Sequence, residues 1–258
     1  MSPRPPKPLA GRTILVTRPP DQSASLVKLL DQREANAIVA PAIEVLPIRS
    51  AALTAALRGL AKGDFSWITI TSRATVEMLA TRLDSPADVR AKVAAIGDGS
   101  AEAFRRWTRR APDLVPATFT TVGLARAFPR GKGRVLCARA DIAPEGLEDA
   151  LAAKGWSPTR VDAYRTRMPR TLPAEARRAL RAGAVDAVTF TSASTVRGFV
   201  GALGPVKGNP KVVCIGPVTA KEARAHGLTV SAVANPHTID GVVEALERVF
   251  SPRRRAGS

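Results

Sequence analysis

The sequence predicts an α/β fold with two similar lobes, each a mainly parallel sheet flanked by helices, joined by a two-stranded crossing. Three observations support this prediction. Three segments recur in the same order, short apolar runs alternate with helical patterns, and two extended segments ending at proline stand at matching places. Alternating strand and helix patterns are typical of βαβ units, which build parallel sheets.

The recurring segments lie at nearly constant offsets. They pair 13–18 (TILVTR) with 134–139 (RVLCAR), 67–76 (WITITSRATV) with 187–196 (AVTFTSASTV), and 92–97 (KVAAIG) with 211–216 (KVVCIG). The corresponding offsets are 121, 120 and 119 residues. Three matches in one order indicate two copies of one set of βα units, and the copies alone suggest a division near residue 130.

In the first copy, each strand is predicted from a short apolar run and each helix from apolar residues at helical spacing. We expect strands near 13–18, 37–42, 67–72, 92–97 and 114–116. We expect helices over about 22–34, 51–61 and 121–128, one carrying Val76 and Leu79, and one carrying Ala101, Phe104 and Trp107.

The second copy repeats this order. We expect strands near 134–139, 158–166, 186–192, 211–216 and 229–234, with helices between them and a final helix over about 238–250. Residues 43–47 (IEVLP) and 164–169 (YRTRMP) remain as two extended segments. We expect them to cross between the lobes, because proline ends a strand and favours an extended preceding residue.

Length and composition limit the class of protein. A chain of 258 residues with 45% hydrophobic residues can bury two cores. Cys137 and Cys214 lie in apolar runs, so we expect buried thiols, and with only two histidines a zinc site is not expected. No stretch resembles a signal peptide or a membrane span, so we expect a cytoplasmic protein with short disordered ends.

The net charge of +17, from 39 basic and 22 acidic residues, favours an anionic partner. Nucleic acid, a membrane surface and a polyanionic small molecule all fit this charge. Part of the excess is peripheral, in Arg4, Lys7 and residues 253–255, and solvated surface arginine explains the excess equally well. One tyrosine and seven phenylalanines do not make the aromatic-studded basic surface of a nucleic-acid-binding protein.

Polar loops follow four predicted strands at equivalent places in the two copies. Their candidate binding residues are Thr71, Ser72, Gly97 and Ser100 in the first copy, and Ser192, Gly216 and Thr219 in the second. Ligands of parallel α/β sheets bind beyond the carboxyl ends of the strands, and helix N-termini attract anions by about 0.3–1 kcal/mol each. Each hydroxyl taken alone is better explained as a helix cap, but four matched loops favour a polyanion site built from main-chain N–H groups.

Other motifs point to no reaction. Gly97-x-Gly99 lacks the third glycine of a dinucleotide-binding fingerprint, and no Walker A pattern occurs. We expect no Ser-His-Asp constellation, because neither histidine is placed in a strand-end loop and His226 fits a helix C-terminal cap. Tyr164 is the only tyrosine and lies in a crossing segment; its phenol can donate a proton, although packing is the commoner role of a strand tyrosine.

Six short motifs in a fixed order carry a resemblance to a known family. They are ILVTRP at 14–19, FSWITITS at 65–72, AIG at 95–97, VDAYRT at 161–166, TFTSAS at 189–194 and CIGPVTA at 214–220. In this order they resemble uroporphyrinogen-III synthases over residues 11–250. The resemblance implies a lyase without cofactor or metal that converts hydroxymethylbilane to uroporphyrinogen III. Loss of the ring A hydroxyl gives an azafulvene, and ring D attacks through its substituted carbon to form a spiro intermediate that recloses with ring D inverted.

The resemblance also implies an organisation and a partner. One lobe would hold residues 1–42 and 168–258 and the other residues 47–163, with the active-site cleft between them. We expect a monomer that binds a linear tetrapyrrole, and neither nucleic acid nor a membrane. Two other classes stay open: a non-enzymatic cytoplasmic two-lobed binding protein or sensor for a polyanionic small molecule, and a basic nucleic-acid-binding protein.

Site residues are carried over where the motifs match. Tyr164 matches the family tyrosine thought to assist departure of the hydroxyl, and the matching polar cleft positions are Ser72, Ser192, Lys211 and Thr219. Ser100 stands where relatives often have threonine. Arg73 receives no role, because relatives often place an arginine slightly later in the motif.

Overall fold

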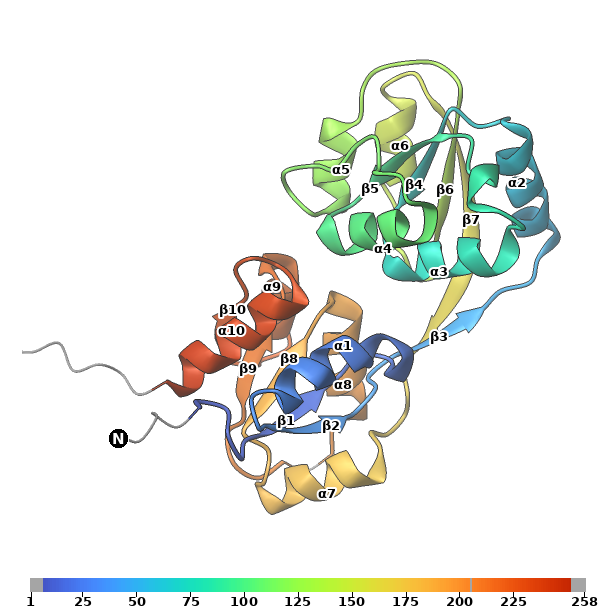
Figure 1. Ribbon diagram of the computed structural model, residues 1–258. Helices are drawn as coiled ribbons and strands as arrows, with labels where there is room; N and C mark the ends of the chain where they lie inside the picture. The colour runs from blue at the N-terminus through green and yellow to red at the C-terminus, as the bar shows by residue number, and fades with distance from the viewer. Residues whose placement is uncertain (1–6, 205, 252–258) are drawn as a thin grey trace, which may run out of the picture. The chain divides into compact units, whose positions relative to one another are not determined.

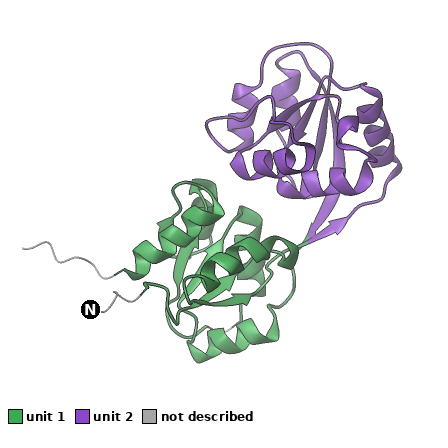
Figure 2. Cartoon of the chain, in the orientation of Figure 1, with its two compact units in different colours: residues 1–44, 167–258 green, residues 45–166 purple. Residues whose placement is uncertain are grey.

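The structure is a computed structural model that describes residues 7–204 and 206–251 (Figure 1). The chain forms two compact units: residues 1–44 and 167–258 make unit 1, and residues 45–166 make unit 2 (Figure 2). Most of the predicted disordered ends, including the basic residues 253–255, lie outside the described ranges. Within those ranges, every helix is too short or too polar to span a bilayer.

Unit 1 contains a five-stranded parallel sheet with the order β10-β9-β8-β1-β2. Its strands are β1 (Thr13–Val16), β2 (Asn36–Val39), β8 (Ala187–Phe190), β9 (Lys211–Cys214) and β10 (Val230–Val233). Leu15 lies opposite Ile38 on one side and Val188 on the other, so β1 is an inner strand. Because an inner strand of a parallel sheet is buried on both faces, its sequence is a continuous apolar run.

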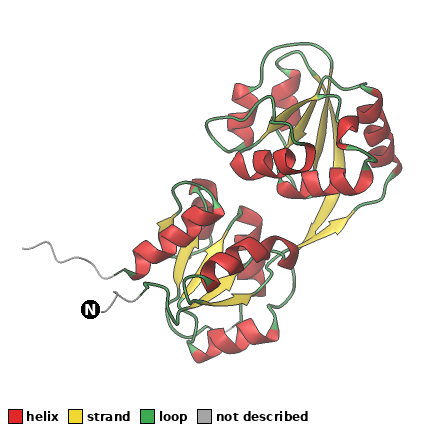
Figure 3. Ribbon diagram, in the orientation of Figure 1, coloured by secondary structure: helices red, strands yellow, loops and turns green. Residues whose placement is uncertain are grey.

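Helices cover both faces of this sheet (Figure 3). The helices are α1 (Pro20–Asp31), α7 (Ala174–Ala182), α8 (Ala193–Ala202), α9 (Pro217–Ala225) and α10 (Ile239–Phe250). Ile14 and Val16 pack with α1 and α10, whereas Leu15 belongs to the core formed with α7, α8 and α9. Alternate strand residues point to opposite faces, which produces these two separate cores.

Unit 2 contains a second five-stranded sheet with the order β3-β7-β6-β4-β5. Its strands are β3 (Glu44–Pro47), β4 (Trp67–Ile70), β5 (Lys92–Ala95), β6 (Arg134–Ala140) and β7 (Ser157–Arg167), and β4 to β7 pair in parallel. Helices α2 (Ala51–Lys62), α3 (Arg73–Arg82) and α4 (Asp98–Thr108) pack in one core. Helices α5 (Thr121–Ala127) and α6 (Leu147–Ala152) pack in the other, and a short 3₁₀ helix spans Pro86–Asp88.

The sequence repeat is reproduced in the sheets, but not as a division of the chain near residue 130. The order β9-β8-β1-β2 in unit 1 corresponds to β5-β4-β6-β7 in unit 2. Unit 1 therefore takes β1 and β2 from the first copy and β8 and β9 from the second. Unit 2 takes β4 and β5 from the first copy and β6 and β7 from the second. Each compact unit thus combines parts of both copies, an exchange that sequence similarity alone does not reveal.

The predicted two-stranded crossing is confirmed. β3 and β7 are neighbours in the sheet, and the boundary between the units falls inside both strands. On the unit 1 side of that boundary, Arg167 Nε donates to Glu44 Oε2 at 3.0 Å. The chain therefore passes between the units twice, through two strands that lie side by side.

Two element predictions need correction. The strand expected at 114–116 is only a single bridge between Ala94 and Leu114. Pro116 has no N–H to donate, so the ladder cannot continue. Helix α1 begins at Pro20 rather than near residue 22, because the fixed φ of proline suits the first position of a helix.

Both cysteines are buried and free, in agreement with the expectation for small apolar core residues. Burial raises the pKa of the Cys137 thiol to about 11 and that of the Cys214 thiol to about 12. Both thiols therefore stay protonated at neutral pH, which makes them weak nucleophiles.

Two glycines of α8 provide a test of the packing in unit 1. A Cβ on Gly198 would lie 1.8 Å from the Ala42 carbonyl oxygen, whereas a Cβ on Gly201 meets no atom within 4 Å. We expect Gly198→Ala to lower the free energy of unfolding by about 1–3 kcal/mol, the usual cost of overpacking. Gly201→Ala should raise it by up to about 1 kcal/mol, because alanine is the better helix former. Urea unfolding followed by circular dichroism measures both, and equal effects would contradict the close approach at Gly198.

Candidate functional site

Unit 2 brings its predicted loop residues to one edge of its sheet. β4 ends at Ile70 and β5 at Ala95, and these two residues are paired in register. Because the strands are parallel, the segments that follow them leave the same carboxyl edge, and they carry Thr71, Ser72 and Gly97 in loops and Ser100 in the first turn of α4. Tyr164 lies near the end of β7, opposite Ala140 at the end of β6, so it belongs to the same edge.

Unit 1 places three of its four predicted residues in the same way. β8 ends at Phe190 and β9 at Cys214, again paired in register, so Ser192, Gly216 and Thr219 follow the carboxyl edge. Lys211 is the exception, because it is the exposed first residue of β9 and pairs with the first residue of β8. It lies at the opposite edge, roughly 10 Å along the strand from Cys214, and the structure does not bring it together with the other three.

Ser72 and Ser192 each cap the helix that follows. Ser72 Oγ accepts a hydrogen bond from the Ala74 N–H at 3.0 Å. Ser192 Oγ accepts one from the Thr195 N–H at 3.2 Å, and the Thr195 hydroxyl donates to the Ser192 carbonyl at 2.8 Å. Helix capping therefore accounts for a hydrogen bond of each serine hydroxyl.

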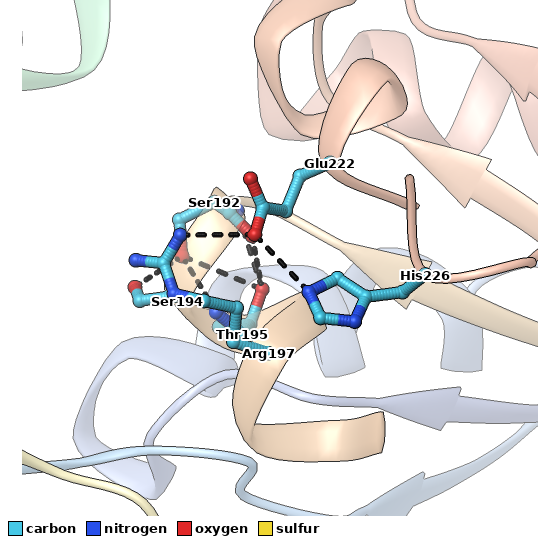
Figure 4. Close-up of polar contacts among 6 residues, drawn as sticks. All are labelled: Ser192, Ser194, Thr195, Arg197, Glu222 and His226. Atoms are coloured by element: carbon cyan, nitrogen blue, oxygen red, sulfur yellow. Dashed lines mark hydrogen bonds and ion pairs between the residues drawn. The ribbon is translucent and has the colours of Figure 1, made fainter. Parts of the chain in front are cut away.

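Two groups of polar contacts lie along α8, one at its start and one that reaches α9 (Figure 4). Ser192 Oγ lies 2.9 Å from Ser194 Oγ. Further along α8, Arg197 Nη1 donates to Glu222 Oε1 at 3.1 Å, and His226 Nε2 lies 3.3 Å from the same oxygen. Glu222 thus ties α8 to the end of α9, where His226 is the C-terminal cap residue, as predicted.

Helices α4 and α9 begin differently from α3 and α8. Their N-cap residues are Gly97 and Gly216, and neither helix has a side-chain cap hydrogen bond. The first-turn N–H groups therefore stay available to an anion. Ser100 and Thr219 stand at the third helical position and are buried, with exposed fractions of 7% and 4%.

An aromatic ring lies against each of these glycines. A Cβ on Gly97 would lie 2.8 Å from the Phe119 ring, and a Cβ on Gly216 would lie 3.6 Å from the His237 ring. His237 follows β10, and its Nδ1 lies 2.7 Å from the Ala234 carbonyl oxygen. The expectation that neither histidine occupies a strand-end loop is therefore wrong for His237. The sequence carried the signal, since this histidine follows a predicted strand directly.

Tyr164 is buried among hydroxyl groups of α3. Its exposed fraction is 6%, and the hydroxyls of Ser72 and Thr75 lower the pKa of its phenol. The Thr75 hydroxyl also donates to the Ala138 carbonyl at 3.3 Å, which links this cluster to β6. Burial raises the pKa of the Tyr164 phenol, while the two hydroxyls and the charge of Arg139 act in the opposite direction. The phenol is therefore protonated at neutral pH.

Arg139 was missed by the sequence reasoning. It is the penultimate residue of β6 and is 1% exposed, and Arg18, at the equivalent place of the repeat just after β1, is 5% exposed. A fully buried arginine is rare because its charge is costly to remove from water. The signal in the sequence was the identical arginine that ends the matched segments TILVTR and RVLCAR.

Arg73 also stands at this edge, as the first residue of α3. Burial, and then the charge of Arg106, lower the pKa of its guanidinium, and Glu77 and Glu102 offset part of the effect. A cation at a helix N-terminus opposes the helix dipole. An anionic ligand at this end of α3 would relieve that repulsion.

Comparison with known sequences identifies the family. Residues 24–244 match the family model described as uroporphyrinogen-III synthase HemD. The chain is 31% identical over 250 residues to the porphyrin biosynthesis protein HemD of Ruminiclostridium josui, covering 93% of this chain and 49% of that protein. The chain thus spans about half the length of that relative. It is 30% identical over 258 residues to a uroporphyrinogen-III synthase of Synechococcus elongatus, covering 94% of this chain and 97% of that protein.

Solved structures agree on the fold. A mutant uroporphyrinogen III synthase of Thermus thermophilus aligns with a TM-score of 0.64 at 21% identity, covering 93% of this chain and 99% of that one. The uroporphyrinogen-III synthetase of Helicobacter pylori aligns with a TM-score of 0.58 at 17% identity, covering 90% and 97%. These comparisons confirm the resemblance that the six motifs indicated: the chain belongs to the uroporphyrinogen-III synthase family.

Proposed function

We propose that this protein is the lyase that cyclises hydroxymethylbilane, with loss of water and inversion of ring D, to give uroporphyrinogen III. The observation that carries the proposal is the family match over residues 24–244. The relative from Synechococcus elongatus, named uroporphyrinogen-III synthase, aligns over 97% of its own length, which supports the same activity for this chain. A binding protein or sensor without turnover has no comparable support.

The charge and the loops suit this substrate. Hydroxymethylbilane carries acetate and propionate groups on all four pyrroles, and the chain has a net charge of +17. We infer that the open N-termini of α4 and α9, at Gly97 and Gly216, receive carboxylates through main-chain N–H groups. The hydroxyls of Ser72 and Ser192, together with Thr71, Ser100 and Thr219, then shape and support these loops.

Tyr164 is the group we assign to departure of the ring A hydroxyl. Its phenol keeps its proton at neutral pH, because burial raises its pKa more than the hydroxyls of Ser72 and Thr75 lower it. A protonated phenol can donate to the leaving hydroxyl as the carbon–oxygen bond breaks. Because the nitrogen lone pair of the pyrrole already drives this ionisation, the phenol needs to supply only part of the assistance. We propose that the chain acts as a monomer and without cofactor or metal.

The activity itself is the first test of this proposal. Purified protein given enzymatically generated hydroxymethylbilane, with no added metal or nucleotide, should release the type III isomer. Isomer analysis by chromatography separates this product from the type I isomer, which forms by uncatalysed closure. Release of type I alone, at the rate of the protein-free control, would refute the activity and leave the polyanion-binding alternative.

Tyr164→Phe tests the role of the phenol. The variant keeps the ring in the core and removes only the O–H, so the fold should survive by circular dichroism. General-acid assistance typically contributes about 10²–10⁴-fold, and the ease of ionisation places the expected loss of kcat near the lower end. Thr81→Val is a suitable control, because its hydroxyl donates to the Glu77 carbonyl on the exposed side of the same helix α3. An unchanged kcat in Tyr164→Phe would show that the tyrosine contributes only to packing.

Asp98 offers a test of main-chain recognition. It is the first residue of α4, the position that Pro217 occupies in α9, so Asp98→Pro should preserve the helix while removing one N–H donor. Compared with Asp98→Ala, which loses the same carboxylate, the proline variant should raise KM roughly tenfold, as expected for loss of a hydrogen bond to a charged group. Thr219→Ala keeps every N–H and should raise KM less than about threefold. A larger increase in KM for Thr219→Ala than for Asp98→Pro would indicate that side-chain hydroxyls, and not main-chain N–H groups, bind the substrate.

A further inference from the structure

The end of strand β6 carries a buried ion pair beside Tyr164. Arg139 Nη1 donates to both carboxylate oxygens of Glu148, at 3.0 Å each, and the exposed fractions of the two side chains are 1% and 17%. Arg139 Nε is buried and has no hydrogen-bond partner among the described residues. One carboxylate thus engages a single nitrogen of the guanidinium, and the pair leaves part of the buried cation unsatisfied.

The backbone ties this arginine to the tyrosine. In the parallel pairing of β6 with β7, Arg139 lies opposite Asp162, but the next residue, Ala140, lies opposite Tyr164. One residue of β7 is therefore skipped, which is a β-bulge, a feature that redirects side chains near active sites. The Asp141 N–H donates to the Tyr164 carbonyl at 3.1 Å immediately after the bulge. Any displacement of the end of β6 therefore moves Tyr164.

We propose that Arg139 is a positioning residue for Tyr164: its ion pair with Glu148 anchors the end of β6 that faces the bulge of β7, and its buried charge favours the phenolate that forms when Tyr164 gives up its proton. The inference rests on the role proposed for Tyr164. In that step the phenolic proton goes to the leaving hydroxyl, which departs as water with the electron pair of the carbon–oxygen bond. The phenolate recovers a proton when the closing macrocycle releases one.

The groups around the phenol have opposing effects. At α3 and its N-cap, the hydroxyls of Ser72 and Thr75 favour the phenolate, and the carboxylate of Glu77 disfavours it. From β6, Arg139 favours the phenolate. Burial is the largest influence and favours the neutral phenol. Among the described residues, Arg139 is the cation that favours the phenolate of Tyr164.

Stability alone does not account for a buried ion pair. Removing two charges from water is costly, and well-packed apolar residues of similar volume are often as stable or more stable. The other copy provides a contrast: Arg18 is also buried after β1, but Ile43 stands 121 residues before Tyr164, at the equivalent position. The arginine is therefore shared by both units, whereas the phenol that it can influence occurs only in unit 2.

The single tyrosine makes a direct test possible. Growth on a fluorinated tyrosine, which is more acidic than tyrosine, labels position 164 alone, and ¹⁹F NMR then reports its titration within the pH range where the fold survives. We expect Arg139→Met to move the titration midpoint to higher pH, because the cation that favours the phenolate is gone. The titration midpoint of Arg139→Lys should stay close to that of the unmodified protein. Arg134→Met is the matched control, since Arg134 is the exposed first residue of the same strand, and its midpoint should not move.

The experiment still decides if the Arg139→Met variant does not fold. Arg139→Met leaves Glu148 without its partner, and if that variant does not fold, Arg139→Met combined with Glu148→Gln removes both charges and gives the same readout. A folded variant lacking the Arg139 charge whose midpoint equals that of the control would overturn the proposal. So would an Arg139→Lys midpoint displaced as far as that of Arg139→Met.

Turnover adds a second readout. For the unlabelled protein, kcat of Arg139→Met should fall roughly tenfold with KM within about twofold, and Arg139→Lys should recover most of it. An unchanged kcat in a variant whose midpoint has moved would overturn the positioning role. If the protein does not convert the bilane at all, the proposed function fails, whereas the titration still decides whether Arg139 controls the phenol.

Discussion

The parallel direction of the strands is the constraint on which the other features of this molecule depend. A parallel strand cannot be followed by a tight turn to its neighbour, so each must lead into a crossover, and here the crossover begins with a helix. Every such helix starts at the carboxyl edge of the sheet, where its first N–H groups lack partners within the helix. Ser72 and Ser192 satisfy some of these groups with a side chain, whereas Gly97 and Gly216 leave them open. The substrate binding proposed for the protein uses the helix N–H groups that this topology leaves without hydrogen-bond partners.

Sequence reasoning performed well where structure is decided locally. The apolar run of β1, the serine caps and the proline-terminated crossing depend on neighbouring residues, and periodicity or capping chemistry predicts them. It failed where the structure of a segment depends on a partner far along the chain. The segment at 114–116 resembles a strand but can pair only at Leu114, and Lys211 shares a matched motif with Gly216 but lies at the other edge of the sheet.

Two residues near the site were missed for similar reasons. His237 was discounted although it follows a predicted strand, because no local pattern places it against the Gly216 loop. Arg139 was taken as part of a repeat, and only the fold reveals that it is buried opposite a bulge that holds Tyr164. The two copies share their strand order but differ in chemistry: the first has an isoleucine at position 43 where the second has its phenol. The two copies therefore share a scaffold, while the phenol occurs in one copy only.

The double passage of the chain between the units also determines the order in which they can fold during synthesis. Unit 2 is a continuous segment, residues 45–166, so all of its strands are available once that segment has left the ribosome. Unit 1 must wait, because Ile14 of β1 pairs with Ala187 of β8, and β9 and β10 follow later still. Until then β1, β2 and α1 form a fragment with an open apolar strand edge, the kind of surface that invites aggregation. The early completion of unit 2 holds the two ends of this unfinished unit close together, because both emerge from its neighbouring strands β3 and β7.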